Sequence, residues 1–284
     1  MERTVRATVQ GQRTVDGAGV HLVRVLGNGT TTEYDPILML DSFDSYDPDD
    51  YIAGFPMHPH RGIETISYVY KGAMRHRDSL GFDDTVRDGE VQWMTAGAGI
   101  VHEEFHAESF GKRGGEFEMA QLWVNLPAKD KKTPARYQHL AKDNITVVPL
   151  ADDAGHARII AGRFGNTDGA AETFTELNVW DIVLNSGASA DLDVPAGHNL
   201  MLVVLRGEVR INGGQSVQAS QMATFERESG SVKVEAVGGE AKILLLSGVP
   251  IDEPVVGYGP FVMNTEAEIA EVMNEFRSGK FGAV

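Results

Sequence analysis

The stretch IETISYVYKGAMRHRDSLG, residues 63 to 81, has the pattern that decides the fold of this chain. A run rich in Ile, Tyr, Val and Thr is followed by Gly72, then by a polar strand-like segment and a turn. The stretch NLMLVVLRGEVRINGGQ, residues 199 to 215, repeats this plan with Gly207 at the matching place. Repetition at a spacing of roughly half the chain predicts two copies of one β-domain.

Similar short segments rich in β-forming residues recur along most of the 284 residues, and Gly, Asp, Asn or Pro closely bound each of them. Many short strands with frequent turns are typical of an antiparallel sandwich or barrel. The expected boundary between the two domains lies in the polar stretch PAKDKKTPARYQHLAKD, residues 127 to 143, because it contains two prolines and a Lys/Asp run. We therefore expect an N-terminal domain over residues 1–135 and a C-terminal domain over residues 136–284.

Only the C-terminal part of the sequence clearly predicts a helix. Thr265 and Glu268 match the capping box that starts many helices. Apolar residues then follow at helical spacing: Ile269, Val272, Met273 and Phe276. Gly279 is the expected stop. We expect this apolar stripe to pack against a sheet.

The composition excludes several classes of protein. The formal net charge of −16 disfavours direct binding to nucleic acid and favours a small neutral or cationic ligand, or a protein partner with a basic patch. Cysteine is absent, so any metal must be held by His, Asp, Glu or backbone oxygen. The first residues lack the apolar core of a secretion signal, and the longest apolar runs, such as MLVVL, are too short to span a membrane. We expect a cytoplasmic protein that does not bind membranes.

A pair of histidines with metal-ligand spacing lies just before the first repeat. His58 and His60 are two residues apart, and side chains two apart on a strand point to the same face, about 7 Å from each other. Pro59 between them donates no backbone hydrogen bond, which places this segment at an edge or a rim of a sheet. The pair alone fits a metal site or two ordinary histidines about equally well.

A second pair with the same spacing, His102 and Glu104, strengthens the metal hypothesis. Three imidazoles and one carboxylate suit a divalent first-row metal ion. Glu64 competes with Glu104, because it shares strand parity with His58 and His60, and His106 shares parity with His102. The remaining histidines have no ligand-spaced partner, so we expect them to be structural or exposed: His21, His76, His139, His156 and His198.

These residues belong to a set of motifs that resembles the pirin family of the cupin superfamily. The motifs of the first half are YDPILMLDSF, HPHRGIET, HRDSLG, GEVQWMTAGAGIVHEE and QLWVNLP. GHNLMLVVLRGEV resembles the second domain of the family, and YGPFVMNT resembles a signature near its end. The resemblance covers nearly the whole chain. It implies an all-β fold of two jelly-roll-type cupin barrels packed face to face, with a short C-terminal helix.

The resemblance also implies which residues bind metal. In pirins the ligands come from the His-Pro-His motif and from the His and Glu of the later motif. In this sequence those residues are His58, His60, His102 and Glu104. Many other cupins take the carboxylate from the first motif, which would be Glu64, but the pirin pattern favours Glu104. The second domain has only His198 where a His-x-His pair would stand, so we expect it to hold no metal.

The resemblance implies an activity like that of quercetin 2,3-dioxygenase. In that reaction the flavonol 3-hydroxyl binds the metal as an oxyanion, dioxygen adds, and the heterocyclic ring opens with loss of carbon monoxide. We expect one divalent metal ion, Fe(II) ahead of Cu, Ni, Zn, Mn or Co. The expected partners are a small phenolic substrate and O2, and Glu104 is the candidate general base for the hydroxyl proton.

A second hypothesis comes from another class of protein. Some pirins resemble regulators that bind a transcription factor or a metabolic enzyme, with iron as a redox-sensitive structural element. The acidic charge of this chain agrees with a basic protein partner. A deep apolar pocket above the metal, with room for a three-ring flavonoid, would instead favour the enzyme.

Overall fold

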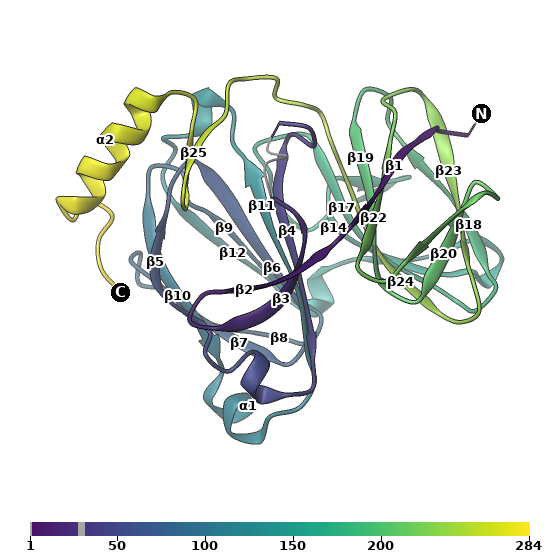
Figure 1. Cartoon of the computed structure of the whole chain (residues 1–284), viewed down its shortest axis with the longest axis horizontal. Helices are drawn as coiled ribbons and strands as arrows, with labels where there is room; N and C mark the ends of the chain where they lie inside the picture. Colours follow the sequence, from purple (N-terminus) through teal and green to yellow (C-terminus); the bar gives the residue numbers. More distant parts are fainter. Residues whose placement is uncertain (1, 28–31) are drawn as a thin grey trace. The chain divides into compact units, whose positions relative to one another are not determined.

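The structure is a computed structural model that describes residues 2–27 and 32–284. Strands dominate these residues, and the longest helix lies near the C-terminus (Figure 1). None of the helices in the described part of the chain is long and apolar enough to cross a membrane. The architecture is all-β with a short C-terminal helix, which confirms the fold class expected from the sequence.

The chain forms two compact units that are not contiguous halves. The first unit comprises Arg13–Lys142 and Ile251–Val284, and the second comprises Met1–Gln12 and Asp143–Pro250. The sequence analysis expects a single boundary after residue 135, whereas in the structure each end of the chain belongs to the unit built mainly by the opposite half. For the N-terminal end, the reason is the pairing of β1 (Val5–Gln10) with β22 (Gln221–Phe225).

The first unit contains a seven-stranded and a four-stranded antiparallel sheet. In spatial order the larger sheet consists of β12 (Arg136–Leu140), β9 (Glu90–Thr95), β6 (Ile63–Lys71), β11 (Phe117–Asn125), β4 (Ile37–Ser45), β3 (Val20–Leu26) and β2 (Gln12–Asp16). The smaller sheet consists of β5 (Phe55–His60), β10 (Ile100–His106), β7 (Ala73–Asp78) and β8 (Asp83–Arg87). The remaining elements are η1 (Pro48–Asp50), α1 (Glu108–Arg113), η2 (Ala128–Asp130), the hairpin of β25 (Val256–Tyr258) and β26 (Phe261–Met263), and α2 (Glu266–Arg277).

The second unit repeats this arrangement of a seven-stranded and a four-stranded sheet. Its larger sheet consists of β1 (Val5–Gln10), β22 (Gln221–Phe225), β19 (Asn199–Arg206), β24 (Ala241–Gly248), β17 (Leu177–Leu184), β14 (Gly155–Ala161) and β13 (Val147–Pro149). Its smaller sheet consists of β18 (Ser189–Val194), β23 (Gly230–Ala236), β20 (Glu208–Ile211) and β21 (Gln215–Gln218). The remaining elements are η3 (Lys142–Asn144), η4 (Ala151–Asp153) and the pair of β15 (Arg163–Phe164) and β16 (Thr167–Asp168).

Matching strands occupy matching places in the two units, which confirms the repeat. The order β9-β6-β11-β4 in one large sheet corresponds to β22-β19-β24-β17 in the other. The two glycines that mark the repeat stand between β6 and β7 and between β19 and β20. Gly72 has φ +101° and Gly207 has φ +79°, a region that side chains disfavour. A Cβ at Gly207 would also lie 2.5 Å from the carbonyl oxygen of Glu240.

The edge strand of each large sheet explains why the N-terminal segment belongs to the second unit. In the first unit β12, which follows β11 in sequence, pairs with β9. In the second unit the equivalent place beside β22 is filled by β1, the N-terminal strand. Figure 1 shows β1, coloured purple, among the green strands of that unit. The equivalent position is therefore filled by a strand from the middle of the chain in the first unit and by the N-terminal strand in the second.

The C-terminal helix forms as the sequence predicts. The Thr265 side chain accepts a hydrogen bond from the Glu268 backbone N–H, and the Glu268 side chain accepts one from the Thr265 backbone N–H, which completes the capping box. Ile269 and Val272 of α2 are buried in one apolar cluster with residues of β26. The helix ends at Arg277, and Gly279 follows with φ +78°. The apolar stripe thus packs against the end of the first unit.

Candidate metal centre

Three of the histidines singled out in the sequence meet in the smaller sheet of the first unit. His58 and His60 lie on β5, and His102 lies on β10 directly opposite His58 in the antiparallel pair. The ring centroids are 4.2 Å apart for His58 and His102, 4.9 Å for His58 and His60, and 5.0 Å for His60 and His102. One nitrogen from each ring lies within 4.8 Å of the other two. The two-residue spacing therefore brings the imidazoles together.

The nitrogens of these rings have the state that a metal ion requires. The Nδ1–H of His58 donates to the carbonyl oxygen of Pro56 at 2.8 Å, which leaves Nε2 as a free acceptor. Within the described residues, the buried Nδ1 of His60 and the buried Nε2 of His102 have no hydrogen-bond partner. Burial, assisted by His58, holds the pKa of His60 and of His102 well below the usual imidazole value. Neutral rings with unpaired buried nitrogens fit a divalent cation.

Glu104 lies two residues beyond His102 on β10 and is 1% exposed. Its Oε1 accepts hydrogen bonds from the Gln92 amide and, at 3.3 Å, from the Ser67 hydroxyl. Its Oε2 accepts one from the Gln121 amide at 3.0 Å. A carboxylate oxygen of Glu104 groups with nitrogens of His102 and His76 within 4.8 Å, beside the cluster of three histidines. The carboxylate is thus held in a fixed position next to the rings.

Glu64, the competing carboxylate, points away from the histidines. Gly62, with φ +79°, separates β5 from β6, so strand parity does not continue from His60 to Glu64. Ser67 contacts Glu104, and Glu64 lies three residues before it on β6, which places Glu64 on the opposite face. Its Oε1 accepts a hydrogen bond from the Thr95 hydroxyl at 2.7 Å. The parity expected from the sequence is wrong here, because a turn interrupts the strand.

His106 shares parity with His102 but takes no part in the cluster. Its Nε2–H donates to the carbonyl oxygen of Tyr51 at 2.9 Å. Its ring packs against those of Tyr51 and Phe117, with centroids 4.7 and 4.4 Å away. Burial lowers the pKa of His106 to about 4. This histidine is a neutral member of an aromatic core.

The sequence analysis missed His76, which lies beside the cluster. Its side chain is fully buried, and its Nδ1 lies 3.4 Å from Nδ1 of His102. Its Nε2 lies 2.9 Å from Oδ2 of Asp78, which is also buried. The expectation that His76 has no ligand-spaced partner is wrong, since Asp78 stands two residues later on the same strand. The two-residue spacing of His76 and Asp78 in the motif HRD is the sequence signal for this pair.

The second unit has a different arrangement around its one buried histidine. His198 is 2% exposed, and its Nδ1 lies 3.3 Å from the Ser247 hydroxyl. Its Nε2 lies 3.5 Å from Oε1 of Glu176. Among the described residues of this unit, no three His, Asp or Glu side chains bring ligand atoms within 4.8 Å of one another.

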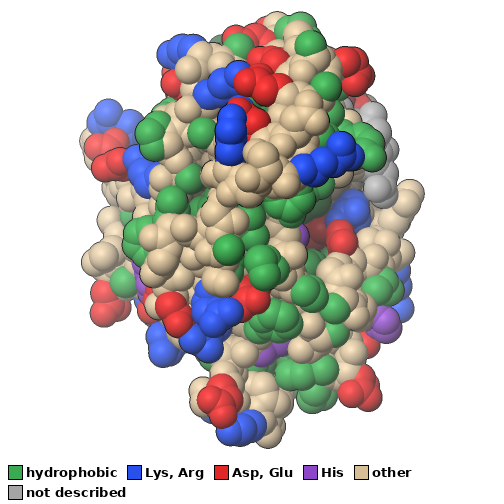
Figure 2. All heavy atoms as spheres, turned by 90° about the vertical axis from the view of Figure 1, so that its left-hand side faces the viewer, with side chains coloured by type: hydrophobic (Ala, Val, Ile, Leu, Met, Phe, Trp, Pro, Cys, Tyr) green, Lys and Arg blue, Asp and Glu red, His purple; other side chains and the backbone are tan. Residues whose placement is uncertain are grey.

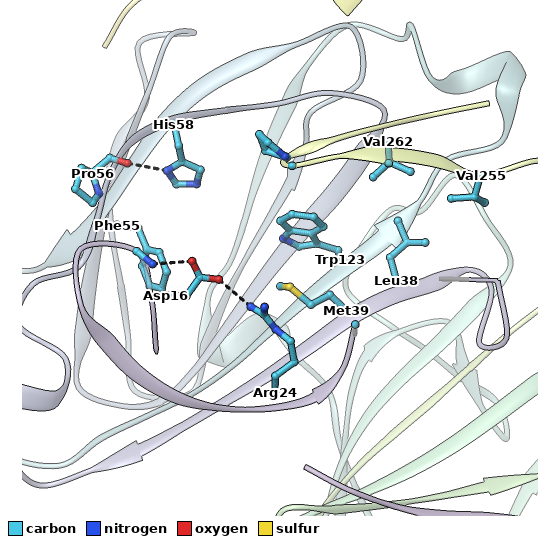
Figure 3. A pocket seen from close by; sticks show the side chains of 15 residues that line it. Asp16, Arg24, Leu38, Met39, Phe55, Pro56, His58, Trp123, Val255 and Val262 are labelled. Atoms are coloured by element: carbon cyan, nitrogen blue, oxygen red, sulfur yellow. Dashed lines mark hydrogen bonds and ion pairs between the residues drawn. The ribbon is translucent and has the colours of Figure 1, made fainter. Parts of the chain in front are cut away.

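A cavity of about 710 Å³ in the first unit reaches the histidine cluster at His58. Figure 3 shows Trp123 beside His58 and the side chains of Arg24 and Asp16 across the cavity from them. The other walls are mostly apolar and include Leu38, Met39, Phe55, Val255 and Val262. The Trp123 ring also meets the His60 ring edge-on, with centroids 5.2 Å apart.

Arg24 is the cationic group of this cavity, and two carboxylates hold it. Its guanidinium donates to both oxygens of the buried Asp41, at 2.8 and 2.7 Å, and to Asp16 at 2.8 Å. On the face that Figure 2 shows, basic side chains are likewise interspersed with acidic and neutral ones.

Two units of jelly-roll type, one with a histidine cluster at the side of an apolar cavity, define a cupin protein with two barrels. Known proteins agree with this class. The Pirin family profile matches residues 19–124, and the profile of the Pirin C-terminal cupin domain matches residues 179–282. "Putative quercetin 2,3-dioxygenase PA2418" from Pseudomonas aeruginosa is 45% identical over 248 residues, which are 87% of this chain and 86% of that protein.

Two further similarities extend over almost the full length. "Putative quercetin 2,3-dioxygenase PA3240", also from Pseudomonas aeruginosa, is 41% identical over 279 residues, which are 95% of this chain and 94% of that protein. The crystal structure of quercetin 2,3-dioxygenase from Acinetobacter baumannii matches with a TM-score of 0.94 at 40% identity, covering 100% of this chain and 99% of that one. This chain belongs to the pirin family.

Proposed function

We propose that this protein is a metal-dependent dioxygenase that uses O2 to open the ring of a flavonol or a related phenol, as quercetin 2,3-dioxygenase does. The observation that carries the proposal is the cavity of about 710 Å³ beside His58. Its volume falls in the range of small-molecule sites, about 300–1,000 Å³. Its walls are mainly apolar, with polar groups at His58 and at the Arg24–Asp16 pair, which suits a flat aromatic substrate with hydroxyl groups at its rim.

The residues that would hold the metal are His58, His60, His102 and Glu104. The buried Nδ1 of His60 and the buried Nε2 of His102, which have no hydrogen-bond partner among the described residues and lie in one cluster, support this assignment. Imidazole and carboxylate ligands suit Fe(II), with Cu, Ni, Zn, Mn and Co as alternatives. A metal ion bound there would act as a Lewis acid and lower the pKa of a coordinated hydroxyl. The second unit, in which His198 bonds to Ser247, is proposed to hold no metal.

The side chains of this chain would position the substrate and handle its proton. Trp123 and the apolar walls would bind the aromatic rings and exclude water from the reacting end. Glu104 is the general base that accepts the hydroxyl proton on a carboxylate oxygen. Gln92 and Gln121 hold Glu104 through their amide groups, so the base stays fixed beside the rings. The names of the similar proteins from Pseudomonas and Acinetobacter support the same reaction class.

Oxygen consumption tests this proposal. Iron-loaded protein given quercetin should take up O2 and release carbon monoxide in equal amounts, and His60→Ala should abolish both. His106→Phe removes a half-buried histidine outside the cluster and should leave uptake unchanged. If the wild type takes up no more O2 than His60→Ala across a panel of phenols, the enzyme proposal fails. A protein partner whose capture depends on the oxidation state of iron would then support the regulatory hypothesis.

A further inference from the structure

The buried side chains of Asp78, His76 and His102 form a line of hydrogen-bonding groups that ends at the histidine cluster. We propose that Asp78 and His76 are positioning residues that fix the tautomer of His102, so that its Nε2 carries a lone pair toward the metal. The inference rests on the proposed metal site but not on the dioxygenase reaction. It assigns a role to two residues that would not themselves bind the metal.

The strand pairing of β7 with β10 sets this line. Asp78 lies opposite His102, and His76 lies opposite Glu104, so the two pairs face the same interior. Nε2 of His76 lies 2.9 Å from Oδ2 of Asp78, and Nδ1 of His76 lies 3.4 Å from Nδ1 of His102. The ring of Tyr137 stacks on that of His76, with centroids 4.7 Å apart and an interplanar angle of 23°. Both nitrogens of His76 are thus committed to partners.

The direction of the hydrogen bonds follows from Asp78. Its Oδ1 accepts from the backbone N–H groups of Leu80 and Phe82 at 2.9 and 3.1 Å, which fixes the carboxylate in the turn after β7. Its Oδ2 then accepts from Nε2–H of His76, which leaves a lone pair on Nδ1 of that neutral ring. That lone pair accepts from Nδ1–H of His102.

The consequence for His102 is a single tautomer. With its proton on Nδ1, the lone pair lies on Nε2. That atom is the buried nitrogen with no hydrogen-bond partner among the described residues, and His102 is the residue that the candidate site shares with His58 and His60. The reverse direction would place a proton on Nε2 and remove it as a ligand. The line from Asp78 therefore determines whether His102 can bind a cation.

The neighbouring ligands are oriented more simply. His58 uses the carbonyl oxygen of Pro56, and His60 has a backbone hydrogen bond to Pro260. Only His102, among the three histidines, has a second imidazole and a carboxylate behind it. His76 is fully buried and Asp78 is 3% exposed, and burying such groups costs free energy unless they are paired. The burial of His76 and Asp78 is explained by the hydrogen bonds that join them in a line to His102.

A second cation site made of His76, His102 and Glu104 does not fit as well, although their ligand atoms lie within 4.8 Å. Nε2 of His76 is occupied by Asp78. Nδ1 of His102 would have to lose its proton while Nε2 also binds metal. The hydrogen-bonded line satisfies every one of these atoms without that cost.

Cobalt(II) binding to two variants of one residue tests the inference. His76→Phe keeps a ring against Tyr137 but offers no acceptor to His102. His76→Asn loses the ring but can place a carbonyl oxygen near the former Nδ1. We expect His76→Phe to weaken Co(II) binding by about 10–100-fold, the usual effect of losing such a partner, and to change the visible Co(II) spectrum. The dissociation constant of His76→Asn for Co(II) should stay within about threefold of the wild-type value. The control His106→Phe should bind Co(II) as tightly as the wild type does.

Asp78→Asn provides an independent measurement if a His76 variant does not fold. The backbone N–H groups of Leu80 and Phe82 retain the oxygen of the new carboxamide, so its NH2 group faces His76 and donates to it. This reverses the line and places the proton of His102 on Nε2, so Co(II) binding should weaken as in His76→Phe. Circular dichroism of the metal-free variants establishes folding.

The outcomes separate the two proposals. If wild type binds Co(II), His60→Ala does not, and His76→Phe or Asp78→Asn binds as wild type, the inference is overturned and the metal site stands. Equal loss in folded His76→Asn and His76→Phe also overturns it, because the ring rather than the acceptor would then matter. If wild type and His60→Ala bind Co(II) equally poorly, the proposed metal site itself fails.

Discussion

Glu64 is a buried carboxyl group whose ionisation opposes folding. It is 0% exposed, and burial raises its pKa to about 7 from the usual value of 4.5. Between these two values the folded chain binds more protons at this site than the unfolded chain does. Protonated Glu64 therefore makes its full contribution to the stability of the folded chain below about pH 4.5. This contribution is lost as the pH rises through about 7. The full difference is on the order of 3 kcal/mol.

Substitution of this residue should change the pH dependence of stability. We expect Glu64→Gln to flatten the fall in the free energy of unfolding between about pH 4.5 and 7, as measured by urea denaturation at several pH values. Glu240→Gln, at an exposed glutamate of the second unit, should leave the slope unchanged. A wild-type slope that persists in Glu64→Gln would show that another group causes it.

At single residues, the sequence predicted the cluster well where the strand is regular. The two-residue spacing correctly placed His58, His60 and His102 together, because side-chain alternation on a strand is a local property. The same rule failed for Glu64, because the rule assumes a continuous strand and Gly62 interrupts it. His76 was missed because its importance comes from its position opposite Glu104 on the neighbouring strand.

Among the elements, the hairpin of β25 and β26 forms a wall of the cavity through Val255, Pro260 and Val262. Lys131, which follows η2, holds this hairpin in place through hydrogen bonds. Its Nζ is buried and donates to the carbonyl oxygens of Gly62 and Val262 at 2.9 and 3.0 Å, and to Asn125 Oδ1 at 2.6 Å. Burial lowers the pKa of Lys131 to about 8. One side chain thus connects the hairpin to the start of β6.

Removing the donors of this lysine should loosen the hairpin. Lys131→Met leaves three buried acceptors without their shared donor, which we expect to cost about 2–4 kcal/mol in the free energy of unfolding. Its neighbour is a matched control: Lys132 is half exposed and pairs with Glu271 at 2.9 Å. Lys132→Met should cost less than about 0.5 kcal/mol. Equal urea midpoints for the two variants would contradict the role given to Lys131.

Elements with local signals were predictable, and those defined by a distant partner were not. The capping box at Thr265 and the apolar stripe of α2 were read correctly, because both depend on neighbours within one or two turns. The pairing of β1 with β22 has no such signal. An edge strand is chosen by the sheet that it completes, so the assignment of β1 to the second unit required the structure.

For the whole molecule, one fold occurs twice with different contents. The first unit has a histidine cluster within its smaller sheet, and the second has a buried His198 bonded to Ser247. The matching strand order was predictable from the repeat around Gly72 and Gly207. Which unit holds the candidate site was also predictable, since the ligand-spaced pairs occur only in the first half of the sequence.

Metal addition should stabilise the two units unequally. At a free metal concentration about 100 times the dissociation constant, binding contributes about 2.7 kcal/mol to the stability of the unit that binds it. We expect amide hydrogen exchange, followed by mass spectrometry, to slow in peptides that contain β5 and β10 and to stay unchanged in β18 and β23. His60→Ala should remove the protection. Protection of β18 and β23 that persists in this variant would reveal a metal in the second unit.

The exchange of chain ends between the units has a consequence for biosynthesis. The ribosome releases β1 roughly 200 residues before its partner β22 exists, so this strand must wait unpaired while the intervening chain emerges. The cavity beside His58 also lacks its Val262 wall until the segment after residue 250 is made. Neither unit can reach its finished form as an early, self-sufficient intermediate, and both should mature only after that segment has emerged.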